Sequence, residues 1–140
     1  MALDSRTYDR GPIPGSVAIS RKAEAAADEN MLVTWGTDEG SCKVLGATEE
    51  VMGWSAGKQV EDQQATIYPV SCAGIWKCKV SSGSTNIYDG ETVEAAGSGE
   101  VKNSVSGSGN TIVGKAMSDG TASGYVLVMP MVATPTAATS

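Results

Sequence analysis

The sequence has no histidine and no phenylalanine, and it has only seven aromatic residues. Without histidine, the most common general base and the usual Ser-His and Cys-His pairs are missing, although a Ser-Lys arrangement stays open. There is also no G-x-S-x-G nucleophile elbow and no GxxxxGK[ST] phosphate loop. The Gly-rich segment Gly97–Asn110 is interpreted as a β-turn region. We therefore predict no catalytic residue and no enzymatic activity.

Cysteine is scarce as well, with Cys42, Cys72 and Cys78 only. No C-x-x-C pair occurs and no histidine could complete a zinc site, so we predict no metal or cofactor. Cys72 and Cys78 lie six residues apart, about 20 Å along an extended strand, which is too far for a disulfide unless the chain folds back at Gly74. Two interpretations stay open: small buried hydrophobic residues beside Trp76, or a disulfide within or between chains that uses Cys42, Cys72 or Cys78.

Positive charge is also in short supply: the net charge is −6 and the pI is about 4.5. An acidic chain without a Lys/Arg cluster is unsuited to nucleic acid and to anionic membranes. No apolar run approaches the length of a transmembrane helix. The N-terminal stretch MALDSRTYDRGPIPG carries charges where a signal peptide needs an apolar core. We therefore expect the mature chain to begin here and to be made in a cytoplasm.

The acidic residues and tryptophans allow functional interpretations that we do not favour. Paired carboxylates at Thr37–Gly40, Glu49–Glu50 and Glu61–Asp62 could serve glycoside hydrolysis or bind calcium. They lack the spacing of an EF-hand calcium site, and acidic residues in such a context are typical of solvated loops. Trp35, Trp54 and Trp76 could form a sugar-binding platform. Packing in the core or at an interface is the interpretation that we favour.

What the chain does contain is 41% hydrophobic residues, 17 glycines and abundant Ser, Thr and Ala, which indicates short strands and turns. We predict an all-β fold, a small β-barrel or β-sandwich. Residues 1–15 are expected to form an extended N-terminal arm, residues 16–132 a single β domain, and residues 133–140 a flexible C-terminal tail. At most one short helix is expected, over residues 20–30, because Ser20 is a suitable N-cap and alanines follow it.

The clearest strand pattern runs from Ile67 to Val80, with period two throughout. One face of this predicted strand is largely apolar, and the other carries lysines and small residues. The apolar face comprises Tyr68, Val70, Cys72, Gly74, Trp76, Cys78 and Val80, and the opposite face comprises Pro69, Ser71, Ala73, Ile75, Lys77 and Lys79.

A weak internal repeat appears when the sequence is shifted by 61 residues without gaps. Leu32 then falls on Val93, Gly53 on Gly114, and Pro69 on Pro130. Two related β units that close into one barrel or sandwich would fit this pattern. Chance matches in a Gly-rich chain are the alternative.

The stretch Thr111–Met131, TIVGKAMSDGTASGYVLVMPM, predicts a hairpin: a strand over Ile112–Ala116, a turn containing Asp119, Gly120 and Gly124, and a strand over Tyr125–Met129. It resembles the C-terminal signature of small bacteriophage capsid cement, or head decoration, proteins. Upstream, YDGETVEAAGSGEVKNS (Tyr88–Ser104) resembles the strand, glycine turn and strand that precede that signature in the family.

The resemblance implies a β-barrel or sandwich, commonly a homotrimer, on the exterior of the capsid in the virion. Such proteins clamp the major capsid protein and stabilise the shell. The N-terminal arm suits strand addition to a partner, with Arg6, Tyr8 and Arg10 as contact residues. Tyr125, Leu127 and Met129 are predicted to form a subunit or capsid interface, because Val126 and Val128 make the opposite face of the same strand equally apolar.

Two other functions stay open at this stage. One is a small β-domain binding module for carbohydrate or a host surface, and the other is a tail or neck subunit of a phage.

Overall fold

The computed structural model describes residues 18–70 and 74–131, and within them it contains ten β-strands and no helix. The prediction of an all-β fold is confirmed. The strands are β1 (Ile19–Ala23), β2 (Met31–Trp35), β3 (Ser41–Val44), β4 (Gly53–Ser55), β5 (Gln64–Pro69), β6 (Trp76–Lys79), β7 (Thr92–Gly97), β8 (Glu100–Asn103), β9 (Ile112–Ala116) and β10 (Tyr125–Pro130).

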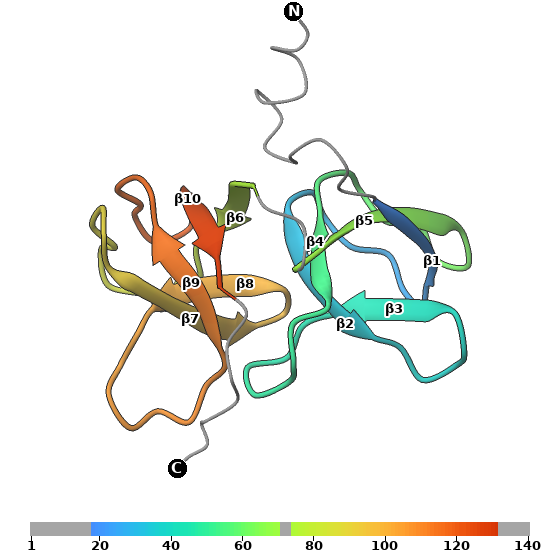
Figure 1. Cartoon of the computed structure of the whole chain (residues 1–140), viewed down its shortest axis with the longest axis horizontal. Coiled ribbons are helices and arrows are strands. Elements are labelled where there is room, and N and C mark those ends of the chain that lie inside the picture. The colour runs from blue at the N-terminus through green and yellow to red at the C-terminus, as the bar shows by residue number, and fades with distance from the viewer. Residues whose placement is uncertain (1–17, 71–73, 132–140) are drawn as a thin grey trace, which may run out of the picture.

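The first five strands form a closed barrel in the order β1-β3-β2-β4-β5. Strand β1 closes the barrel by pairing parallel with β3 on one side and antiparallel with β5 on the other. The remaining pairs are antiparallel. We call this barrel, residues 18–70, the first unit; it is the right-hand half of Figure 1.

The last five strands repeat this topology. Their sheet has the order β6-β10-β9-β7-β8, and a parallel bridge between Val80 and Val101 brings the chain after β6 back to β8. When β8 is placed next to β6 through this bridge, the order becomes β6-β8-β7-β9-β10. This order matches β1-β3-β2-β4-β5 of the first unit strand by strand. We call residues 74–131 the second unit, and Figure 1 shows it beside the first.

The strand registers define how the two sequences correspond. Gly53 pairs with Pro69, and Gly114 pairs with Pro130, so β4 and β5 match β9 and β10 with the expected shift of 61 residues. Val33 pairs with Gly53, whereas Val93 pairs with Gly114. The shift at β2 and β7 is therefore 60, and the predicted match of Leu32 with Val93 is wrong by one residue because the connections differ in length.

Two clusters of buried apolar side chains form the interior. The smaller fills the first barrel with Ala23, Val33, Cys42, Met52, Ala65 and Ile67. The larger fills the second unit and also includes Leu32, Leu45 and Val51 of the first. Trp54 of the first unit stacks on Trp76 of the second, with ring centroids 6.3 Å apart, and its indole N–H donates to the Lys77 carbonyl at 3.0 Å. The units thus share one continuous apolar cluster.

The predicted helix over residues 20–30 is wrong. Residues 19–23 form β1, whose Ala23 is fully buried in the first barrel, and residues 24–30 contain bends and an isolated bridge from Ala27 to Gln59. Alanine favours helix by well under 1 kcal/mol per residue, so pairing with two neighbouring strands overrides it. In the described ranges, no helix has the length and apolar character needed to cross a membrane.

The predicted single strand from Ile67 to Val80 is instead the end of β5 and the whole of β6, which belong to different units. The predicted apolar face is correct for Trp76, Cys78 and Val80, which are buried. The predicted apolar face is wrong in β5, because Ile67 is fully buried there and Tyr68 is only partly buried. The chain changes sheets between Pro69 and Trp76, which breaks the alternation.

Both predicted hairpins are present. Strand β9 pairs antiparallel with β10, as expected for Thr111–Met131, and β7 pairs antiparallel with β8 within Tyr88–Ser104. The predicted arm, residues 1–15, and the predicted tail, residues 133–140, lie outside the described residues.

The paired glycines Gly53 and Gly114 test the correspondence of the units. A Cβ at Gly53 would overlap the Tyr68 carbonyl oxygen, and one at Gly114 would overlap the Met129 carbonyl oxygen. We expect Gly53→Ala and Gly114→Ala each to lower the free energy of unfolding by about 1–3 kcal/mol, because neighbouring backbone must move. Urea unfolding measures this effect.

The matched control is Gly57→Ala, since an added Cβ there meets no atom within 4 Å. It should change stability by less than about 0.5 kcal/mol. Equal stability of Gly114→Ala and the wild type would contradict the close approach of β9 and β10.

Candidate interaction surface

The outer side of β10 is apolar and open to solvent. Tyr125, Leu127 and Met129 are 41–42% exposed, whereas Val126 and Val128 between them are at most 1% exposed. Successive side chains of a strand point to opposite sides of its sheet, which explains this division. The strand predicted over Tyr125–Met129 is confirmed, and its use as a subunit or capsid interface stays a prediction. One face fills the core of the second unit, and the other is uncovered in the single chain.

Three lysines lie beside these apolar side chains. Lys79 pairs across the strands with Tyr125, Lys77 with Leu127, and Lys115 with Met129. The Lys77 ammonium lies 4.8 Å from the centre of the Tyr125 ring, within the range of a cation–π contact. We define the β10 face as the set Tyr125, Leu127, Met129, Lys77, Lys79 and Lys115. It is a positively charged apolar surface on an acidic protein.

The corresponding side of β5 shows that the fold does not require this composition. With a shift of 61 residues, Tyr125 corresponds to Gln64 and Leu127 corresponds to Thr66, and both of these residues of the first unit are polar and exposed. Only Met129 has an apolar counterpart, the partly buried Tyr68, which lies against Trp54 with ring centroids 6.0 Å apart. The apolar β10 face is therefore a property of the second unit alone.

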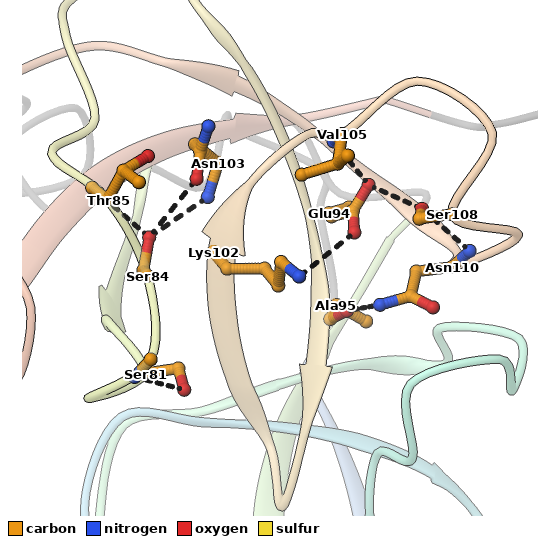
Figure 2. Close-up of polar contacts among 11 residues, drawn as sticks. Ser81, Ser84, Thr85, Glu94, Ala95, Lys102, Asn103, Val105, Ser108 and Asn110 are labelled. Atoms are coloured by element: carbon orange, nitrogen blue, oxygen red, sulfur yellow. Dashed lines mark hydrogen bonds and ion pairs between the residues drawn. The ribbon is translucent and has the colours of Figure 1, made fainter.

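A second notable cluster surrounds Glu94, a carboxylate in the middle of β7 that is only 1% exposed (Figure 2). Its Oε1 accepts hydrogen bonds from the Val105 amide at 3.0 Å and the Ser108 hydroxyl at 2.9 Å. Its Oε2 lies 3.8 Å from the Lys102 ammonium. Asn110 donates to the Ala95 carbonyl at 2.9 Å beside it. These contacts hold the loop of residues 104–111 against the sheet.

The first unit has a simpler contact at the same place. Thr34 corresponds to Glu94 in the strand registers, is also buried, and donates to the Glu50 carbonyl at 2.7 Å. The loops that Glu94 and Thr34 hold are in contact with each other. The Thr111 amide donates to the Ala47 carbonyl, and the Thr111 hydroxyl donates to the Glu49 carbonyl. The Glu94 cluster therefore has a structural role in joining the units.

The acidic pairs considered for hydrolysis make structural contacts or face solvent. Glu49 accepts from the Gly46 amide at 2.7 Å and lies 3.1 Å from the Lys43 ammonium. The Gly46 hydrogen bond, followed by the Lys43 contact, lowers the pKa of Glu49. Glu50, Glu61 and Asp62 are exposed. Across residues 18–70 and 74–131, no three His, Cys, Asp or Glu side chains gather in a way that could hold a metal ion.

Glu24, outside those pairs, holds the Thr37–Gly40 turn. Its carboxylate accepts from the amides of Thr37 and Asp38 and from the Ser41 hydroxyl. The Ser41 hydroxyl is the main cause that lowers the pKa of Glu24.

The cysteines that the structure describes are buried thiols. Cys42 lies in the first barrel and Cys78 lies in the larger cluster, and they are not joined to each other. Burial raises the pKa of both thiols, which makes them poor nucleophiles. The interpretation of Cys78 as a small hydrophobic residue beside Trp76 is confirmed. Cys72 lies outside the described residues, so a disulfide that includes it stays a prediction.

The tryptophans do not form a common platform. Trp76 is 3% exposed and Trp54 stacks on it between the units, which confirms their predicted packing role, whereas Trp35 is 48% exposed. The predicted arm contacts Arg6, Tyr8 and Arg10 lie outside the described residues. Sequence reasoning missed Glu94, although a carboxylate flanked by Val93, Ala95 and Ala96 in a strand was a usable signal.

Comparison with known proteins bears on the fold. No protein-family model matches the chain, and no curated protein sequence matches it either. Among solved structures, the chain is similar to the head fiber gp8.5 N base of bacteriophage phi29, with a TM-score of 0.64 and 13% sequence identity. The similarity covers 82% of this chain and 93% of that chain. At this identity the likeness shows a shared fold.

The role of Glu94 can be tested by removing its carboxylate. We expect Glu94→Ala to lower the free energy of unfolding by about 1–3 kcal/mol, because the Val105 amide and the Ser108 hydroxyl lose their acceptor. Amide hydrogen exchange should accelerate at Val105. Glu50→Ala, at an exposed side chain, is the control and should leave Val105 unchanged. Equal exchange at Val105 in Glu94→Ala and the wild type would contradict this role.

Proposed function

We propose that this chain is a structural protein of a phage virion that sits on the exterior of the head and stabilises the shell by binding the major capsid protein. The observation that carries the proposal is the similarity in fold to a phage head fiber base, which spans both units and 93% of that chain. The sequence resemblance of Tyr88–Met131 to head decoration proteins supports the same class of particle.

The surface of the molecule supports a role in assembly. Large apolar side chains gather on the β10 face, at positions where the related first unit carries Gln64 and Thr66. Exposed apolar side chains grouped on one face are typical of sites that bind another protein. In this proposal the chain has no catalytic activity, and it associates with itself, with a homotrimer as the form that the family resemblance implies.

Reconstitution on heads tests the proposal. Heads would be purified from a phage in which a nonsense codon prevents production of this protein, and purified protein would then be added. We expect saturable binding to expanded heads and greater resistance of the shell to heat and chaotrope. The readouts are co-sedimentation and the release of packaged DNA during heating.

The control is an unrelated acidic β protein of similar size, which should neither sediment with the heads nor protect them. Failure of the purified protein to bind such heads, or binding without any gain in resistance, would contradict the proposed stabilising role.

A further inference from the structure

We propose that the β10 face of one copy binds the first unit of a second copy, so that the chain associates head to tail. This inference rests on the self-association in the proposed function but not on binding to a capsid.

The contact between the two units shows how one unit covers another. Trp54 and Tyr68, at the edge shared by β4 and β5, lie against each other, and Trp54 stacks on Trp76 at the start of β6. The corresponding residues of the second unit are Lys115 and Met129, which are exposed. The position through which the first unit contacts the second is therefore occupied in the second unit by Lys115 and Met129, and nothing in the described residues covers these two side chains.

The charges favour the first unit as the partner. Residues 18–70 contain nine acidic and four basic side chains, for a formal charge of −5, whereas residues 74–131 contain five and four, for −1. The β10 face itself contributes three lysines. A symmetric contact of two β10 faces would bring six lysines together, which is unfavourable. A contact with the acidic first unit pairs opposite charges.

The first unit also offers apolar groups with acidic neighbours. Its large exposed hydrophobic residues are Trp35, at 48% exposure, and Val60, at 52%. Asp38 and Glu39 follow Trp35 in the next turn, and Glu61 and Asp62 follow Val60 directly. Exposed apolar side chains with carboxylates near them in the sequence complement the β10 face, whose apolar side chains lie beside lysines. A contact between two different surfaces of identical chains forms a closed ring when the rotation from one copy to the next permits it. Otherwise the contact forms an open filament.

Two variants separate the two sides of the proposed contact. The face variant, Tyr125→Gln with Leu127→Thr, introduces the residues that the first unit carries at the corresponding positions of β5, which that barrel accommodates. The acid variant, Asp38→Asn, Glu39→Gln, Glu61→Gln and Asp62→Asn, removes four negative charges from the first unit. Tyr88→Gln is the control, because Tyr88 is 55% exposed and lies outside the β10 face.

Sedimentation velocity measures association in the absence of any capsid. We expect the wild type and Tyr88→Gln to sediment as species heavier than the 14.3 kDa chain. Each of the two test variants alone should associate at least about tenfold more weakly. An equimolar mixture of them should form a dimer, because the acid variant retains an intact β10 face and the face variant retains an intact first unit. Urea unfolding confirms that both variants are folded.

Several outcomes would overturn the inference: a monomeric wild type, undiminished association of the face variant, an equal loss in Tyr88→Gln, or no dimer in the mixture. A monomeric wild type whose face variant fails to bind heads would assign the β10 face to the capsid. That result would overturn the proposed self-association and leave the proposed binding to the head intact. Conversely, head-to-tail association of a protein that does not bind heads would overturn the proposed function alone.

Discussion

The stack of Trp54 on Trp76 joins the two halves of this molecule. The first barrel has strands of three to six residues and a small apolar interior of its own. The larger cluster extends from the second unit to Leu32, Leu45 and Val51 of the first. Because so small a barrel buries little apolar surface, each unit gains stability from the surface that it shares with the other.

The same junction explains the polar contacts around it. Loops that lie between two packed units bury part of their backbone, and buried amides and carbonyls need partners. Thr34, Glu94 and Thr111 supply these partners from side chains, and the Gly99 backbone bridges Leu32 and Leu45 directly. Glu94 is therefore best understood as a residue that fixes a loop. Its burial reflects the position of β7 between the core and that loop.

Period-two alternation in the sequence was sufficient to predict the hairpin of β9 and β10 and the two faces of β10, because both are local properties of a strand. It also placed Lys77 and Lys79 opposite Trp76 and Cys78. The helix over residues 20–30 and the continuous strand over Ile67–Val80 were wrong because pairing with distant strands and a crossover between units decided the outcome. The contacts of Glu94 depend on a loop ten or more residues away, so its partners could not be inferred from β7.

The repeat within the chain allows the β10 face to be compared with the corresponding side of β5. Because both units share one topology, the first unit shows which residues the fold itself requires at these positions. Where the units differ, we infer a role in assembly, and we propose that this assembly is a virion. Mass spectrometry of purified virions tests whether the chain is part of the particle. We expect the intact chain in an amount comparable to the other proteins of the head surface, and we expect mild protease treatment of whole virions to cleave it. Virions that lack the chain, while infected cells contain it, would show that it is not a virion protein.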